Sequence, residues 1–167
     1  GPGSGKSFVT AGAFGGTGLK LVNSDASFER GLRKGNLSLK MPDEEEYFRN
    51  IVRAKAKMTT ATQLDAYIQG RLGLVIDATG RDKNVINNQK KQLDLIGYDS
   101  YMIFVNTSLE IAQERNLERE RKLQPEEVEK MWRDVQENIM KFQQLFGADK
   151  FQIIDNNGGL EDPTRKE

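Results

Sequence analysis

The chain opens on the segment Gly1–Ser7, GPGSGKS, which is the most constraining feature of the sequence. It matches the last seven positions of the phosphate-binding loop G-x-x-x-x-G-K-[ST], a pattern that also requires a glycine directly before Gly1. In such a loop the glycines bring backbone N–H groups against phosphate oxygens, and the following helix adds the positive end of its dipole. The predicted phosphate site consists of Gly1, Pro2, Gly3, Ser4, Gly5, Lys6 and Ser7.

Lys6 and Ser7 supply the charged and metal-binding groups of this loop. A lysine at this position reaches the β- and γ-phosphates of ATP, and the hydroxyl after it ligates Mg²⁺. The competing interpretation is that GPGS is left over from an expression vector and that the match is accidental. The stretch Leu74–Asp77, an apolar run that ends in a carboxylate, is a second and independent sign of a nucleotide site and favours a genuine loop.

Charge and composition exclude several classes of site. The chain carries 25 Lys and Arg residues against 25 Asp and Glu residues, so any affinity for nucleic acid or another polyanion must be local. With no cysteine and no histidine, the chain cannot form disulfides, thiol nucleophiles, imidazole bases or zinc sites made of these residues. A general base must therefore be a carboxylate.

The length of 167 residues suits one domain with a core of its own. We expect this domain over residues 1–155, truncated at its N-terminus, followed by a flexible tail over residues 156–167. No apolar run approaches ~18 residues, and the N-terminus lacks a basic-then-apolar signal segment. The expected protein is therefore cytoplasmic and does not contact a membrane.

Apolar runs and helical periodicities alternate along the chain. Strands that alternate with helices indicate an α/β fold of P-loop NTPase type, with a parallel sheet and helices on both of its faces. Because a phosphate loop follows a strand, the first and central strand would precede Gly1 and is missing from the chain. Strands are expected at 19–23, 72–77, 101–105 and 151–154, and helices at 7–14, from 26, at 42–57, 60–70 and 82–96, from 107, and at 125–147.

Polar residues at the helix starts predict caps, and apolar residues within the helices predict the core. Ser24 or Asp25 would cap the helix that begins at residue 26, and Thr107 with Glu110 forms a capping-box pattern. Pro125 occupies a first helical position. The expected core residues are Val85, Ile86, Leu93 and Ile96 in one helix, and Val128, Met131, Trp132, Val135, Ile139, Phe142 and Phe146 in another.

Two aspartates follow predicted strands at the edge where ligands of open α/β sheets bind. Asp77 would hold Mg²⁺ directly or through water, and the alternative is an ordinary strand-end aspartate. Asp25 would accept the proton of an attacking hydroxyl, a role that no histidine fills in this chain. The alternative for Asp25 is the helix cap, and one carboxylate can serve both purposes.

Basic residues complete the candidate site. Thr79 and Arg81 follow Asp77 in a tight turn and would bind substrate, although Arg81 is equally well explained as a solvated loop residue. Arg119 and Arg121 belong to a basic segment that would close over the nucleotide and stabilise the migrating phosphoryl group. Glutamates alternate with the arginines from Arg115 onward, so the alternative is a solvated helix face with internal ion pairs.

The motif GPGSGKS, the segment Asn23–Phe28 and the stretch LVIDATGRD together resemble the zeta toxin family of P-loop kinases, whose best-known members phosphorylate UDP-N-acetylglucosamine. The segment Arg115–Trp132 is similar to the kinase domain of bacteriophage polynucleotide kinase, in which an arginine lid precedes a helix that starts with proline. The resemblance spans most of residues 1–147. Residues 37–70, where such kinases hold their acceptor, match neither family.

The resemblance implies a P-loop kinase domain with a five-stranded core and a central first strand. It also implies Lys6 and Ser7 on ATP and Mg²⁺, Asp25 as general base, Asp77 near the metal, and Arg119 on the phosphates.

The leading functional hypothesis is an ATP-dependent kinase that transfers the γ-phosphoryl group to a hydroxyl of a nucleotide sugar, a polynucleotide end or another small molecule. The alternative is a P-loop ATPase or nucleotide-binding switch without kinase activity. The sequence contains no N-K-x-D guanine-recognition motif, which argues against a GTP switch. A single chain does not identify a protein partner, and an antitoxin is one candidate.

Overall fold

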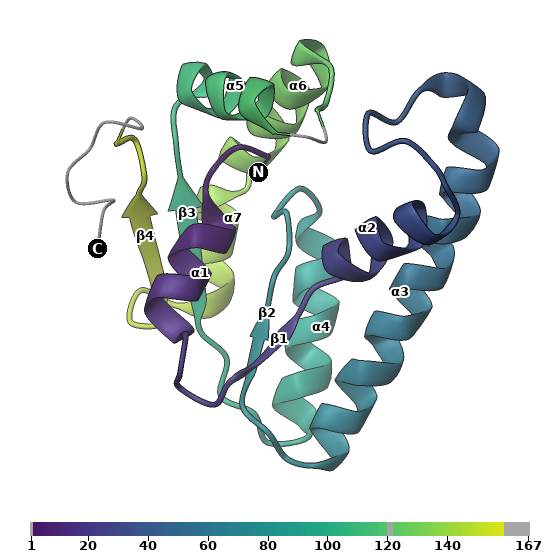
Figure 1. Ribbon diagram of the computed structural model, residues 1–167. Helices are drawn as coiled ribbons and strands as arrows, with labels where there is room; N and C mark the ends of the chain where they lie inside the picture. Colours follow the sequence, from purple (N-terminus) through teal and green to yellow (C-terminus); the bar gives the residue numbers. More distant parts are fainter. Residues whose placement is uncertain (1, 120–121, 159–167) are drawn as a thin grey trace. The chain divides into compact units, whose positions relative to one another are not determined.

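The computed structural model describes residues 2–119 and 122–158, and it is an α/β structure with parallel strands (Figure 1). This fold class agrees with the expectation from alternating apolar runs and helical patterns. In chain order the elements are α1 (Lys6–Phe14), β1 (Lys20–Val22), α2 (Asp25–Lys34), the 3-10 helix η1 (Asp43–Glu45), α3 (Glu46–Gln69), β2 (Leu74–Ile76), α4 (Lys83–Leu95), β3 (Met102–Asn106), α5 (Leu109–Glu118), α6 (Pro125–Gln136), α7 (Ile139–Phe146) and β4 (Phe151–Asp155).

The chain divides into two compact units. The first unit contains the described residues of 1–9, 79–118 and 123–167, and the second contains those of 10–78 and 119–122. Each unit holds one pair of parallel strands, β3 with β4 in the first unit and β1 with β2 in the second.

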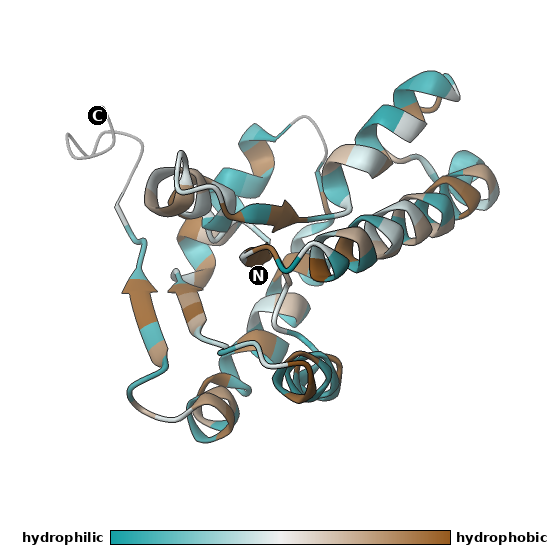
Figure 2. Ribbon diagram, turned by 90° about the horizontal axis from the view of Figure 1, so that it is seen from below, coloured by the Kyte–Doolittle hydropathy of each residue, from teal (hydrophilic) through white to brown (hydrophobic). Residues whose placement is uncertain are grey.

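The core of the first unit lies between its strand pair and its helices. Phe104 of β3 packs with Ile86 of α4, Val135 of α6 and Phe142 of α7, and all four side chains are buried. The apolar run of β4 completes this layer by pairing with β3 over the whole length of both strands. Figure 2 shows β4, the arrow that leads into the grey C-terminal trace, as mostly hydrophobic.

The core of the second unit is a helical hairpin beside a short strand pair. In Figure 1, α2 lies along α3, and the contact buries Phe28, Leu32 and Ala56. The guanidinium of Arg53 stands 4.2 Å from the centroid of the Phe28 ring, which adds a cation–π attraction to this packing.

The expected break between two helices within residues 42–70 is wrong, because α3 is one helix of 24 residues. Three threonines, Thr59, Thr60 and Thr62, lie at or next to the position of the expected break. Their hydroxyls instead donate to carbonyls one turn earlier, Thr59 to Lys55, Thr60 to Ala56 and Thr62 to Met58, at 2.9–3.1 Å. The polar atoms are thus satisfied within the helix, and the helix continues through them.

The opposite correction applies to residues 125–147, where a single apolar stripe predicted one helix. Two helices, α6 and α7, are found there, and the chain turns at Glu137 and Asn138. Val135 and Phe142 of the predicted stripe are buried, as expected. In α4, Ile86 is buried but Val85 is exposed, and so is Ile96, the C-cap residue, so the predicted inward face of that helix is narrower than its apolar residues suggest.

Two helix starts can be compared with the predicted caps. Ser24, one of the two residues predicted to cap α2, occupies its N-cap position without a side-chain cap hydrogen bond, and the helix begins at Asp25, one residue earlier than predicted. Ser108 accepts the hydrogen bond of the Ile111 N–H in the first turn of α5, where Thr107 had been expected to act as the cap. No helix among the described residues is both long enough and apolar enough to cross a lipid bilayer.

Candidate phosphate-binding site

The chain before α1 has the backbone geometry of an anion-binding loop. Gly3 and Gly5 both have left-handed φ angles, 73° and 76°, and flank Ser4, whose side chain is buried. Alternating left- and right-handed residues turn successive N–H groups toward one concave side, which suits a phosphate. The N–H groups of Phe8 and Val9 both donate to the Gly5 carbonyl, so the loop passes directly into the first turn of α1.

Close packing adds to the φ requirement at both glycines. A Cβ on Gly3 would lie 2.3 Å from the Ala112 carbonyl oxygen of α5, and a Cβ on Gly5 would lie 2.2 Å from the Asn156 side-chain nitrogen. At Gly3 the obstacle is backbone, whereas at Gly5 it is the end of a side chain, so a side chain at Gly5 would displace the Asn156 carboxamide. The G-x-G of the motif is therefore explained by contacts within the first unit.

The predicted loop residues that would contact phosphate and metal lie at the start of α1. Lys6 is the first residue of this helix and is partly buried, and Ser7 follows it and is exposed. The positive end of the helix dipole lies here and favours an anion. Gly1 lies outside the described residues.

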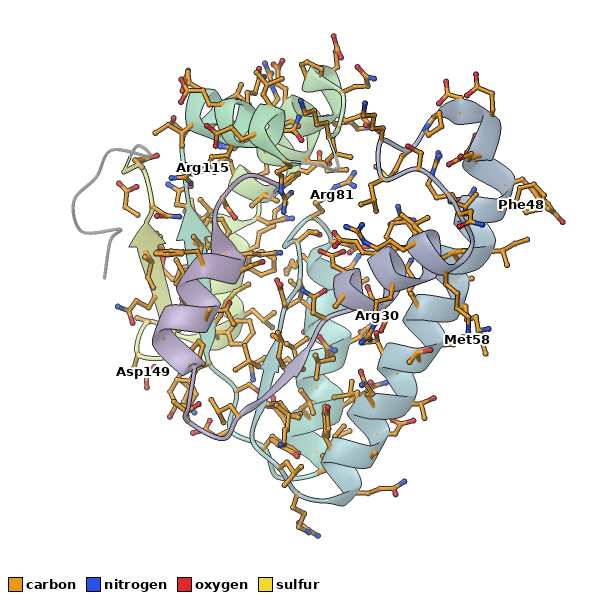
Figure 3. The ribbon with its side chains drawn as sticks, in the orientation of Figure 1. Arg30, Phe48, Met58, Arg81, Arg115 and Asp149 are labelled. Carbon is orange, nitrogen blue, oxygen red and sulfur yellow. The ribbon has the colours of Figure 1, made fainter. Side chains whose placement is uncertain are left out.

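Two side chains hold the loop from the side of its carbonyl groups. Arg115, on α5, donates from Nη1 to the Gly3 oxygen at 3.2 Å, and from Nη2 to the oxygens of Asn156 and Gly158 at 2.8 Å each (Figure 3). The Asn156 side chain donates from Nδ2 to the Ser4 oxygen at 2.8 Å. Consecutive loop carbonyls are thus bound by different elements of the first unit.

Residues 156–158 begin the expected tail, yet they are hydrogen-bonded to the rest of the first unit. The Asn156 N–H donates to the Asn106 carbonyl at 2.9 Å, extending the β3–β4 ladder by one residue. The Asn157 carboxamide oxygen accepts from the Ser108 N–H and from the Thr107 hydroxyl. The remainder of the tail lies outside the described residues.

In the second unit, Asp25 and Asp77 are joined through one asparagine at the carboxyl ends of β1 and β2. Asn23 Nδ2 donates to the Asp77 carboxylate at 2.8 Å, and Asn23 Oδ1 accepts from the Asp25 N–H at 2.7 Å. The Asp77 N–H donates to the Val22 carbonyl, which continues the strand pairing up to this point. The structure thus places the two predicted acidic residues at one sheet edge.

The predicted substrate residues Thr79 and Arg81 are exposed and lie in an ordered turn of the first unit. Gly80 between them has φ 73° and is buried. The Asn138 side chain donates to the Gly80 and Arg81 carbonyls at 3.1 and 2.8 Å, and the Arg81 guanidinium is 3.4 Å from the Asp134 carboxylate. This turn is therefore held by the α6–α7 junction.

The arginine segment, the chain between Glu118 at the end of α5 and Leu123, begins with Arg119, which is exposed in a bend. Asn116, only 2% exposed, links the two ends of this segment, since it donates to the Leu123 carbonyl at 2.8 Å and accepts from the Leu123 N–H at 3.0 Å. Arg121 lies outside the described residues.

Near the start of α5, hydrogen bonds from its own backbone and from the Ser108 side chain lower the pKa of Glu110.

Several residues that shape these sites were missed by sequence reasoning, namely Asn23, Asn116, Asn138 and Asn156. They share one property, a carboxamide that bonds backbone or carboxylate groups outside regular secondary structure. Asn23 and Asn156 each follow directly after a strand, and this position is the one sequence signal that marked them.

A comparison with family models places the chain among known proteins. A model described as an AAA domain matches residues 1–142, which is most of the chain. The chain belongs to the AAA domain family. No curated protein matches it. The AAA domain match identifies a P-loop nucleotide-binding protein, and it includes the phosphate loop, both acidic residues and the arginine segment.

Proposed function

We propose that this protein is an ATP-dependent kinase that transfers the γ-phosphoryl group of ATP to a hydroxyl acceptor. The observation that carries the proposal is the loop of Gly3–Ser7. Gly3 and Gly5 have left-handed φ angles, and α1 begins directly after them with Lys6 and Ser7 in its first turn. Such a loop binds the β- and γ-phosphates of a nucleoside triphosphate.

The remaining roles follow from the chemistry of the residues. Lys6 would bind the phosphates, while Ser7 and Asp77 offer the oxygen donors that Mg²⁺ prefers. The bound ion would neutralise charge on the phosphates during transfer. Asp25 would accept the proton of the acceptor hydroxyl, because the chain has no histidine to do so.

Positive charge for the transferred group would come from Arg119 and Arg121, and the acceptor would be bound by Thr79 and Arg81. The exposure of Thr79, Arg81 and Arg119 supports these assignments, since each side chain is accessible to a ligand. The resemblance to zeta toxins and to bacteriophage polynucleotide kinase suggests a nucleotide sugar, a polynucleotide end or a small molecule as acceptor. We also propose a cytoplasmic location, where ATP and Mg²⁺ are available, and an antitoxin remains a candidate partner.

A second candidate is a P-loop ATPase or nucleotide switch, and the AAA domain match is the observation that favours it. The two functions differ in the fate of the γ-phosphate. A kinase moves it to an acceptor, whereas an ATPase releases it to water and does so without an added hydroxyl compound.

The test is the transfer of label from γ-³²P-ATP to a mixed library of nucleotide sugars, oligonucleotides and small alcohols. Phosphorylated product should form with the wild-type protein and fall by at least ~100-fold in Lys6→Ala, since a loop lysine stabilises the transferring phosphoryl group. Lys91→Ala, on α4, is the matched control and should retain activity. Release of free phosphate without any labelled acceptor would favour the ATPase instead.

A further inference from the structure

The phosphate loop is held on its carbonyl side by residues that come from the far end of the chain. Asn156 lies 152 positions after Ser4, yet its Nδ2 donates to the Ser4 oxygen at 2.8 Å. Arg115 lies 112 positions after Gly3 and donates to the Gly3 oxygen at 3.2 Å. Two adjacent loop carbonyls are therefore fixed in direction by contacts outside the loop.

The direction of a carbonyl determines the direction of the next N–H, because both belong to one planar peptide group. Fixing the Gly3 oxygen fixes the N–H of Ser4, and fixing the Ser4 oxygen fixes the N–H of Gly5. These N–H groups point to the opposite side of the loop from their carbonyls. They are the groups that a nest of this kind offers to an anion.

Asn156 is itself well placed to act as a support. Its N–H donates to the Asn106 carbonyl at the end of β3, so its backbone continues the β3–β4 ladder. Its carboxamide lies so close to the loop that a Cβ on Gly5 would be 2.2 Å from Nδ2. Arg115 bonds the carbonyls of Asn156 and Gly158 at 2.8 Å, which joins both supports into one unit.

We propose that Asn156 and Arg115 are positioning residues that hold the phosphate loop in its binding conformation before nucleotide arrives. The inference rests on the proposed function only in that a nucleotide binds this loop. Without the supports the loop samples other conformations, and the apparent affinity falls in proportion to the competent fraction. Asn156 thereby supports the nucleotide site without having to touch the nucleotide.

The test measures binding of a fluorescent ADP analogue, with Mg²⁺, at a temperature well below the melting midpoint. Asn156→Ala should weaken binding by about tenfold, in line with the loss of one hydrogen bond that orders the loop. Asn156→Asp should weaken it further, because a carboxylate oxygen then faces the Ser4 oxygen. The matched control is Asn157→Ala, whose carboxamide bonds Thr107 and Ser108, and it should bind within about twofold of wild type.

A second variant, Arg115→Lys, changes the other support, which lies on α5. The test therefore does not depend on the folding of Asn156→Ala alone. Lysine keeps the charge but lacks the planar fork that bridges several carbonyls, so binding should still fall by about tenfold. Full rescue by lysine would show that only the charge matters and would overturn the positioning role of Arg115.

A readout without nucleotide separates positioning from overall stability. Hydrogen exchange of the Phe8 and Val9 amides, which donate to the Gly5 carbonyl at the end of the loop, should speed up in Asn156→Ala and Arg115→Lys, while the amides of α7 remain protected. Unchanged loop exchange together with unchanged ADP affinity would overturn the inference, and so would a wild-type protein that binds no ADP. A protein that binds ADP in this way but transfers no phosphate would refute the kinase proposal and leave the positioning role standing.

Discussion

The Asn23 side chain donates a 2.8 Å hydrogen bond to the Asp77 carboxylate, and its oxygen accepts from the Asp25 N–H at 2.7 Å. One carboxamide thus connects the ends of β1 and β2 and the start of α2. The bond restrains one oxygen of Asp77, and if Asp77 holds Mg²⁺ as proposed, its orientation toward the ion would depend on such outer contacts.

Replacing Asn23 with alanine should therefore weaken the response to Mg²⁺. The expected result is a rise of about 10- to 100-fold in the Mg²⁺ concentration needed for half-maximal phosphoryl transfer, as is usual for residues that orient metal ligands. The measurement is a Mg²⁺ titration at saturating ATP. Asn88→Ala, on α4, is the control and should follow the wild-type curve, whereas equal curves for both variants would contradict the role of Asn23.

Two glycines near the start of the chain should respond in opposite directions to alanine. Gly12 lies inside α1, and nothing lies within 4 Å of the position that an alanine methyl group would occupy, so Gly12→Ala should stabilise the protein by about 0.5–1 kcal/mol. Gly3→Ala places a methyl 2.3 Å from the Ala112 oxygen at a left-handed φ, and it should destabilise the protein and abolish nucleotide binding. Urea unfolding and ADP binding of both variants check this contrast, and a stabilising Gly3→Ala would contradict the close packing of loop and α5.

The sequence predicted the parts of this molecule that depend on local patterns. Apolar runs located the four strands of the described residues, and the glycine and lysine spacing of residues 2–7 located the loop before α1. At the α6–α7 junction a local pattern failed because a distant contact decides the outcome. The α6–α7 break occurs at Asn138, whose carboxamide bonds carbonyls near residue 80, and no periodicity within residues 125–147 reveals that contact.

Some residues of the candidate site follow from local patterns in the sequence, and others depend on distant contacts. Lys6, Ser7 and Asp77 belong to motifs and can be identified from spacing, and their chemical roles remain predictions. The supports Arg115 and Asn156 cannot be found in this way, because each bonds a loop carbonyl more than a hundred positions away. Backbone carbonyls have no sequence signature, so a residue that acts on them is visible only once the chain is folded.

Asn138 should be important for both stability and acceptor binding. It is 6% exposed and donates to the buried Gly80 carbonyl and the partly buried Arg81 carbonyl, so Asn138→Ala leaves both acceptors without this donor and should cost about 1–3 kcal/mol of unfolding free energy. The turn that carries Thr79 and Arg81 should loosen, which predicts a higher KM for the acceptor and an unchanged KM for ATP. Gln143→Ala, exposed on α7, serves as the control, and an equal rise of both KM values would argue against a local effect.

Asn116 should govern access to the arginine segment. Its carboxamide bonds both backbone groups of Leu123, so Asn116→Ala should destabilise the protein by about 1–3 kcal/mol and open the segment between the two residues. Trypsin cleavage after Arg119 or Lys122 should then become faster under native conditions. Leu117→Ala, at a side chain that is 61% exposed on the same helix, should leave both the stability and the cleavage rate close to wild type.

The ion pair between Asp99 and Lys150 should make stability depend on pH at both extremes. The Lys150 and Tyr101 hydrogen bonds hold the pKa of Asp99 below its ordinary value, and the Asp99 hydrogen bond raises the pKa of Lys150. The contribution of Asp99 is therefore complete above about pH 4 and lost as the pH falls through its lowered pKa, while that of Lys150 is complete below about pH 10 and lost as the pH rises through its raised pKa.

Asp99→Asn should accordingly lower the melting midpoint by no more than a few degrees at pH 7, since both side chains are solvent-accessible, and it should flatten the acid limb of the stability curve. Lys150→Met should flatten the alkaline limb. Thermal melts of both single variants and the double variant, from strongly acidic to strongly alkaline pH, measure the coupling between the two residues. If the effects of the two single variants simply add up in the double variant, the interaction energy between Asp99 and Lys150 is zero, and the ion pair does not stabilise the protein.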